Sequence, residues 1–269
     1  MTDDAGGRTW ESLRPYEADI APDAQVLIIA GQGGAKSTLT ATLLLDSPSL
    51  VALDSKGRLT LPRSRTIELP AFAEHRPGYL PGDSAAVVAY DGAVAGALKL
   101  PGPRTSRWVR LRGMSDPNDP ASKRLILRVH PLDVDDAVVH DRIFRAIYLT
   151  RPDTITWVDE ITGTGASAQS TPRWMRALTA RGRTRGQGLW TMTQSPFGLV
   201  PPLIRRNADL IIIGSIDRAD ARGLPFDGAE IAAAIPRKTG RFIVYVSGES
   251  EPYRLFVPIP RELKDWKAP

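Results

Sequence analysis

The sequence of 269 residues contains no cysteine, which excludes disulfide bonds, thiolate zinc sites and cysteine nucleophiles. Its histidines, His75, His130 and His140, are scattered and do not show the spacing of metal ligands. Apolar runs such as 24–30 and 208–214 are much shorter than the ~20 residues that a membrane-spanning helix requires. The polar, acidic start of the chain is unlike a signal peptide. We therefore expect a redox-neutral cytoplasmic protein that has no membrane span of its own.

What the sequence does contain is typical of a globular protein. Hydrophobic residues make up 42% and charged residues 24% of the chain, and the net charge is +5. Arginines cluster at 104–112, 123–128 and 173–185. A moderately basic surface attracts DNA or RNA through counterion release, although an arginine-rich proteome would produce the same composition.

Short apolar runs alternate with helical stretches along most of the chain. We expect helices at 36–45, 135–149 and 171–180, and apolar runs of strand type at 26–30, 50–54, 86–90, 125–129, 154–158, 189–193, 210–213 and 242–246. Strands that are apolar on both sides and alternate with helices predict an α/β fold, with a mostly parallel β-sheet covered by helices on both faces.

The segment 58–119 interrupts this alternation. It is rich in proline, glycine and arginine, and we interpret it as an irregular insertion with candidate strands at 65–69 and 107–112. Residues 262–269 are expected to form a loose terminal tail. We therefore expect one domain that spans residues 1–269.

A glycine-rich turn between an apolar run and a helical stretch is the strongest local pattern. Residues 30–38 read Ala-Gly-Gln-Gly-Gly-Ala-Lys-Ser-Thr, similar to the phosphate-loop pattern G-x-x-x-x-G-K-[ST]. Ala30 and Ala35 stand where the two signature glycines would lie in a loop of standard length. Alternatively, Gly31 is the first glycine and the loop is one residue shorter. Backbone N–H groups of such a turn, together with the helix N-terminus, bind phosphate.

This loop predicts ATP and Mg²⁺ as ligands. Lys36 is expected to bridge the β- and γ-phosphates, and the Ser37 hydroxyl is expected to bind Mg²⁺. An ordinary turn is the alternative, but it would not explain a lysine at a helix start, where the helix dipole disfavours positive charge. The predicted nucleotide-binding residues are Gly31, Gln32, Gly33, Gly34, Ala35, Lys36, Ser37 and Thr38.

A second pattern is an apolar strand that ends in two adjacent carboxylates, Asp159 and Glu160. Residues at the C-terminal end of a parallel strand face the ligand crevice. Asp159 is a candidate Mg²⁺ ligand, and Glu160 is a candidate to polarise the attacking water. A helix N-cap is the alternative role for the aspartate, but the upstream phosphate loop favours catalysis.

Two further features follow the acidic pair in the chain. The apolar strand 188–193 ends in Gln194, a candidate contact to the γ-phosphate or the attacking water, or simply a polar strand end. Before it lie Arg181, Arg183 and Arg185, which cannot all be buried without partners. In a ring-forming ATPase, such an arginine reaches the γ-phosphate of the neighbouring subunit. A solvated or DNA-facing loop is the alternative.

Together these residues resemble the HerA–FtsK superfamily of ring-shaped DNA-translocating ATPases. The match is clearest over residues 183–215, RTRGQGLWTMTQSPFGLVPPLIRRNADLIIIGS, where an arginine-bearing loop, a strand ending in Thr-Gln, a proline-containing turn and Asn-Ala-Asp follow the family's order. Residues 50–59, LVALDSKGRL, are similar to the Asp-x-Lys-Gly segment of type IV secretion coupling proteins. The resemblance implies a RecA-like ASCE P-loop NTPase core, with Lys36, Asp159, Glu160 and Gln194 in its catalytic site and residues 181–185 as the trans-acting finger region.

A small chain of this type without membrane segments resembles viral genome-packaging ATPases. We therefore expect a motor that translocates double-stranded DNA as a pentameric or hexameric homo-oligomeric ring. It would act in the host cytoplasm, at a capsid portal or packaging vertex. Candidate DNA contacts, for which a solvated surface is the alternative, are Lys56, Arg58, Arg107, Arg110 and Arg112.

Three other functions are alternatives for a chain with these motifs. A conjugative DNA-transfer ATPase shares the chemistry but requires a membrane partner. A ParA-like partitioning switch has a similar phosphate loop, but it normally carries a second lysine where this chain has Gly31 and Gln32. A small-molecule kinase fits poorly, because no arginine-rich lid pattern is evident.

Overall fold

The structure is a computed structural model of the chain. It describes residues 20–69, 71–72, 84–98, 123–194, 197–217, 219–220, 224, 235, 240–249, 253–258 and 261–263. The expected strand at 107–112 lies outside these residues, as do the candidate DNA contacts Arg107, Arg110 and Arg112 and the tail beyond residue 263.

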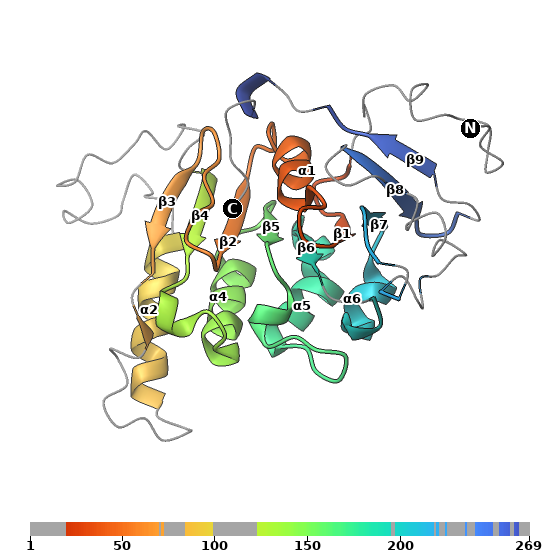
Figure 1. Cartoon of the computed structure of the whole chain (residues 1–269). Coiled ribbons are helices and arrows are strands. Elements are labelled where there is room, and N and C mark those ends of the chain that lie inside the picture. Colours follow the sequence, from red (N-terminus) through yellow and green to blue (C-terminus); the bar gives the residue numbers. More distant parts are fainter. Residues whose placement is uncertain are drawn as a thin grey trace, which may run out of the picture.

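A nine-stranded sheet in the order β3-β4-β2-β5-β6-β1-β7-β8-β9 forms the centre of the fold (Figure 1). The seven strands from β3 to β7 in this order are parallel, whereas β8 and β9 are joined by antiparallel pairing. The strands are β1 Gln25–Ile29, β2 Leu50–Asp54, β3 Arg65–Glu68, β4 Arg124–Arg128, β5 Ile155–Val158, β6 Gly188–Thr193, β7 Leu210–Ile213, β8 Arg241–Val246 and β9 Tyr253–Phe256. The predicted α/β class with a mostly parallel sheet is therefore confirmed.

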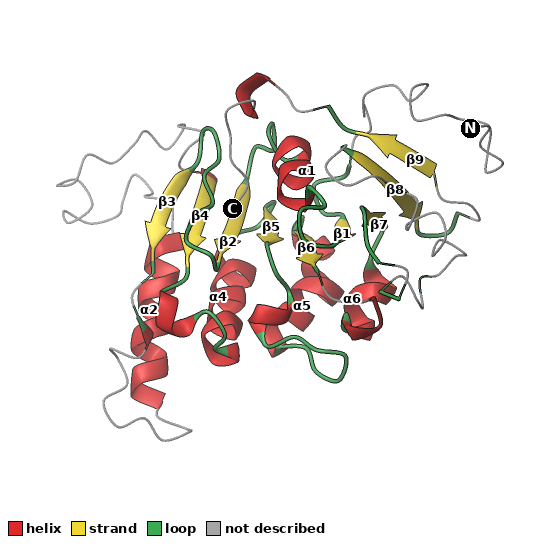
Figure 2. Ribbon diagram, viewed as in Figure 1, coloured by secondary structure: helices red, strands yellow, loops and turns green. Residues whose placement is uncertain are grey.

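Helices cover both faces of this sheet, as Figure 2 shows. Helix α1 Lys36–Leu43 lies on one face, and α2 Ser84–Leu98, α4 Ala137–Thr150, α5 Arg173–Arg181 and α6 Pro202–Asn207 lie on the other. None of the helices in the described ranges is long and apolar enough to span a membrane.

Two hydrophobic layers result from the alternation of side chains along the strands. In β1, Leu27 packs in the layer of α4 and α5, whereas Ile28 packs in the layer of α1 beside Leu39. Both β1 side chains are 0% exposed, and each such burial contributes about 1.5–3 kcal/mol of transfer free energy. This explains why the parallel strands read as continuous apolar runs.

The prediction of a strand-type run at 86–90 is wrong, because these residues lie within helix α2. A short apolar run does not by itself distinguish a strand from a buried helix. Here the apolar character continues to residue 98, and Tyr90, Val94 and Leu98 are all buried at helical spacing. They pack in the same hydrophobic layer as Ile143 of α4.

The segment 58–119 thus contributes to the core. It supplies β3, which pairs with β4 at the edge of the sheet as the candidate strand at 65–69 predicted, and it supplies α2. The run expected at 242–246 forms β8, but β8 pairs antiparallel with β7. The assignment of residues 1–269 to one domain stays a prediction.

Chain order and strand order together bring distant segments to one edge of the sheet. The end of β1 at Ile29 lies beside Thr193 of β6 and Ile213 of β7, and Val158 of β5 lies beside Thr191 of β6. The carboxyl ends of parallel strands are where α/β proteins bind ligands. This carboxyl edge therefore gathers the loop after β1 and the residues that follow β5 and β6.

Candidate functional site

The loop after β1 leads directly into a helix, as the phosphate-loop pattern predicts. Strand β1 ends at Ile29 and helix α1 begins at Lys36, so that residues 30–35 form the turn. Gly33 has φ 73° and Ala35 has φ 62°, both in the left-handed region. This conformation costs an alanine roughly 1–2 kcal/mol. Ala35 thus adopts the backbone that a signature glycine would adopt without strain.

Neighbouring glycines accommodate the other alanine of the loop. A Cβ atom added to Gly34 would lie 2.7 Å from the Ala30 methyl group, and one added to Gly214 would lie 2.8 Å from it. The loop is also anchored by a hydrogen bond of 2.8 Å from the Gly31 N–H to the Ser215 carbonyl. Alanine at position 30 therefore depends on glycine at both 34 and 214.

Helix α1 presents an open N-terminus to this loop. It has no side-chain cap and no acidic residue in its first turn, so the backbone N–H groups of that turn are available to an anion. Lys36 is the first residue of this helix. Its ammonium donates to the carbonyls of Ala30 at 2.5 Å and Gly31 at 3.1 Å. Burial lowers the pKa of Lys36 to about 8, and nearby Glu160 opposes this shift.

The acidic pair lies directly across from the start of α1. Asp159 is 4% exposed, and its Oδ1 accepts a hydrogen bond of 3.2 Å from the Ser37 hydroxyl. Glu160 accepts from the Thr162 hydroxyl at 3.0 Å and from the Gln194 backbone N–H at 3.2 Å. The Asp159 carboxylate therefore faces the loop, whereas Glu160 is held between the ends of β5 and β6.

The Ser37 hydroxyl and the Asp159 carboxylate fit a bound Mg²⁺. Both supply oxygen, which this ion prefers, and Mg²⁺ at a nucleotide site usually takes one or two protein ligands together with phosphates and water. Among the described residues, no group of three or more His, Cys, Asp or Glu could form a protein-only metal cage.

Lys56, which we expected to contact DNA, lies at this site. Its ammonium lies 2.9 Å from Asp159 Oδ2. The buried Asp54 carboxylate at the end of β2 accepts backbone N–H bonds from Arg58 at 3.3 Å and Leu59 at 2.9 Å. These bonds form the turn that carries Lys56 to the carboxyl edge. The Asp-x-Lys-Gly residues, which the sequence showed only as a resemblance to coupling proteins, form this turn. The sequence does not show that β2 and β5 are neighbours.

The arginine cluster lies at the amino ends of the parallel strands, opposite the carboxyl edge that carries the loop. We call this side of the sheet the amino edge. The cluster precedes β6, whose six residues separate it from Gln194 by roughly 20 Å. Arg183 pairs with Asp209, and Arg185 donates to the Leu149 carbonyl at 3.3 Å. Arg181 is exposed, and its side chain has no hydrogen-bond or ion-pair partner within the described part of the chain. The cluster is therefore not part of the same chain's loop site.

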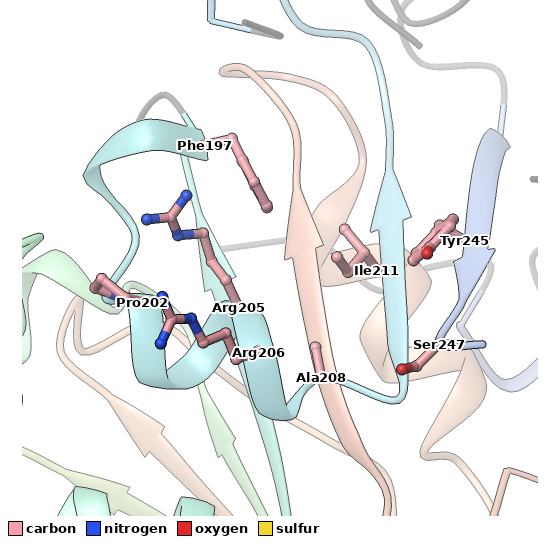
Figure 3. Close-up of a pocket in the computed structure, with 8 residues that line it drawn as sticks. All are labelled: Phe197, Pro202, Arg205, Arg206, Ala208, Ile211, Tyr245 and Ser247. Atoms are coloured by element: carbon pink, nitrogen blue, oxygen red, sulfur yellow. The ribbon is translucent and has the colours of Figure 1, made fainter. Parts of the chain in front are cut away.

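A pocket of about 390 Å³ lies beside α6 (Figure 3). Arg205 and Arg206 line it from α6, and Ile211 and Tyr245 line it from β7 and β8. The Arg205 guanidinium lies 5.1 Å from the centre of the Phe197 ring. Both arginines of this pocket lie within residues 183–215, the segment that resembles the HerA–FtsK superfamily. The pocket is separate from the loop site.

No protein-family model matches the chain, and no curated protein matches it. Solved structures are similar in fold. The genome packaging NTPase B204 from Sulfolobus turreted icosahedral virus 2, in complex with AMPPCP, matches 89% of this chain and 100% of its own at 13% identity, with a TM-score of 0.58. VirB4 of Thermoanaerobacter pseudethanolicus matches 90% of this chain and 91% of its own at 13% identity, with a TM-score of 0.54. The bacterial conjugative coupling protein TrwB matches 90% of this chain and 86% of its own at 13% identity, with a TM-score of 0.51.

At this identity the likeness concerns the fold. The chain has the fold of these proteins over nearly its whole length, which agrees with the P-loop core expected from the sequence. The loop after β1 and the acidic pair after β5 lie at its carboxyl edge, where α/β folds bind their ligands.

Proposed function

We propose that this chain is an ATP-hydrolysing motor of the HerA–FtsK type that translocates double-stranded DNA and packages a viral genome into a capsid. The observation that supports ATP hydrolysis best is the meeting of two motifs at one edge of the sheet. The Ser37 hydroxyl of the loop lies 3.2 Å from the Asp159 carboxylate, and Glu160 adjoins Asp159.

In this proposal the turn after β1 binds the phosphates of ATP. The N–H groups at the start of α1 and the Lys36 ammonium interact with the β- and γ-phosphates. Ser37 and Asp159 would hold a Mg²⁺ ion, which when bound would supply positive charge next to the phosphates. Glu160, oriented by Thr162 and the Gln194 N–H, accepts a proton from the attacking water.

A ring would explain the position of the arginines. A side chain at the amino edge cannot reach a phosphate at the carboxyl edge of its own sheet, but it can reach that of a neighbour in a head-to-tail ring. Arg181 is our candidate finger, because it is exposed and lacks a partner among the described residues, whereas Arg183 and Arg185 bond within the chain. We propose a pentamer or hexamer.

Double-stranded DNA as the substrate is supported by the fold and by charge. Proteins of similar fold include a genome packaging NTPase and a conjugative coupling protein, and the chain carries a net charge of +5. Conjugative DNA transfer is a second candidate function, because a conjugative coupling protein has a similar fold. A packaging motor would bind a capsid portal or vertex, whereas a conjugative enzyme would bind a membrane partner.

The test of this function is DNA-stimulated ATP hydrolysis. We expect double-stranded DNA of any sequence to raise turnover at low salt, and we expect the stimulation to fall steeply as salt increases, because phosphate contacts release counterions. Turnover is measured with and without DNA at several salt concentrations, with subunit number measured in parallel. An ATP turnover rate that is the same with and without DNA would contradict a DNA-translocating motor. A dimer that forms only with ATP would favour the partitioning switch.

Lys56 allows a sharper prediction. Its ammonium pairs with Asp159, and in this proposal it would compete with Mg²⁺ for that carboxylate. We therefore expect Lys56→Ala to lower the Mg²⁺ concentration for half-maximal binding of a fluorescent ATP analogue by up to roughly fivefold, since partly exposed ion pairs contribute at most about 1 kcal/mol. Lys56→Arg, which keeps the charge, is the control. An unchanged Mg²⁺ requirement together with weaker DNA binding would instead support the DNA contact predicted from the sequence.

A further inference from the structure

A second pocket lies at the amino edge of the sheet, away from the phosphate loop. It is open to solvent and has a volume of about 570 Å³. It is lined by Ser49 and Thr154 just before β2 and β5, by Leu98 at the end of α2, by Lys123 beside β4 and by Arg151. The length of β5 separates it from Asp159 by roughly 15 Å. Its volume is in the range of small-molecule sites.

Arg151 is the unusual member of this pocket. It is 5% exposed, its Nε is buried without a hydrogen-bond partner, and its side chain makes no hydrogen bond or ion pair with any described residue. The buried Arg124 nearby differs, because it donates to the carbonyls of Leu44 at 2.9 Å and Ser47 at 2.5 Å. A buried guanidinium without partners is costly to the fold.

Capping of helix α4 does not account for Arg151, although it follows that helix directly. Four of the carbonyls at this helix end already have side-chain donors. The Gln187 side chain donates to Ile147 at 3.1 Å, Tyr148 at 3.2 Å and Arg151 at 2.7 Å. Arg185 donates to Leu149. The Arg151 backbone carbonyl is therefore fixed by Gln187. The Arg151 side chain does not cap the helix and instead lines the pocket.

The surroundings of Arg151 favour an anion with an apolar part. Burial lowers the pKa of Arg151 to about 10, so that it remains charged at neutral pH, and Lys123 adds a second positive charge at the rim. The hydroxyls of Ser49 and Thr154 bond to each other at 2.7 Å. Asp153 also lines the pocket but forms no ion pair with Arg151. Leu98, Pro48 and Pro152 supply apolar surface.

We propose that this pocket is a binding site for a small organic anion, which places a phosphate or carboxylate group on Arg151 and its apolar part against Leu98 and the two prolines. The pocket beside α6 (Figure 3) is a weaker candidate, because Arg206 is exposed and Arg205 already lies over a phenylalanine ring. The proposal does not depend on ATP hydrolysis.

The test uses the full chain with Lys36→Ala, which removes the main charge of the phosphate loop. Phenyl phosphate and benzoate are titrated by calorimetry at constant ionic strength in chloride, with phenol as the neutral control. We expect both anions to bind and phenol not to. Arg151→Gln should weaken binding at least about tenfold, because hydrogen bonds to a charged group are lost. Lys123→Gln should weaken it by roughly twofold, and Arg176→Gln on the exposed side of α5 should leave it unchanged.

The outcomes separate the possibilities. Binding of only one of the two anions identifies the group that Arg151 selects and still supports the site. No binding above the chloride control, or equal binding in the Arg151→Gln protein, would overturn the proposal. If circular dichroism shows that Arg151→Gln does not fold, the titration of Lys123→Gln decides, and unchanged affinity there counts against the site. Loss of ATP hydrolysis in a separate assay bears only on the proposed function.

Discussion

Glu160→Gln should reduce ATP turnover by about two to four orders of magnitude, the usual contribution of a general base, and leave ATP binding nearly unchanged. The amide keeps the shape of the carboxylate. Its one oxygen can still accept from the Gln194 N–H, and its NH2 group can donate to the Thr162 hydroxyl, which accepts in turn. It cannot take a proton from water. The loop, Lys36 and the pair of Ser37 and Asp159 are untouched by the change.

Two measurements check this expectation. Steady-state hydrolysis reports turnover, and the binding of a fluorescent ATP analogue reports affinity, both with DNA present. Glu249→Gln is the matched control, because Glu249 is an exposed glutamate beyond the end of β8. Turnover within a few-fold of the unchanged chain would rule out Glu160 as the base. Loss of binding would assign it a structural role instead.

Lys36→Ala should weaken ATP binding by roughly a hundredfold and abolish measurable turnover. Each charge-assisted hydrogen bond contributes about 1.5–3 kcal/mol, and the ammonium lies between the loop carbonyls and the acidic pair, where it is 7% exposed. Its charge cannot be replaced by water there. The same affinity and turnover assays apply, with Arg176→Ala on the exposed side of α5 as the control. Retained affinity would show that the loop does not bind phosphate through Lys36.

The same variant tests the ring. In a head-to-tail ring each site would combine Lys36 of one subunit with Arg181 of the next, so mixing inactive Lys36→Ala with Arg181→Ala restores some complete sites. Random mixing in equal amounts gives complete sites at up to about a quarter of the interfaces. Recovery of activity on mixing supports a finger in trans. Arg181→Ala with unchanged turnover would remove Arg181 from the site.

The sequence alone was sufficient for the main elements of the carboxyl edge. A buried strand followed by glycines, Lys36 and Ser37 requires a turn into a helix N-terminus, whatever surrounds it. A strand that ends in Asp159 and Glu160 requires those carboxylates at the same edge, because parallel strands end together. These are local consequences of backbone geometry and strand periodicity, which is why the pattern predicted them.

Other features could not be read from local patterns. The apolar run at 86–90 became a helix, because packing against α4, rather than composition, decided between the two periodicities. Lys56 reached Asp159 only because β2 and β5 pair, and glycine at 214 is needed only because it lies against the Ala30 methyl group. In the sequence, nothing distinguishes Arg151 from a surface arginine. Only the fold shows that Arg151 is buried and that Gln187 donates to the carbonyls around it. Sequence determines which groups stand at strand ends, but only tertiary structure decides which strands are neighbours, and both charge pairing and burial depend on that choice.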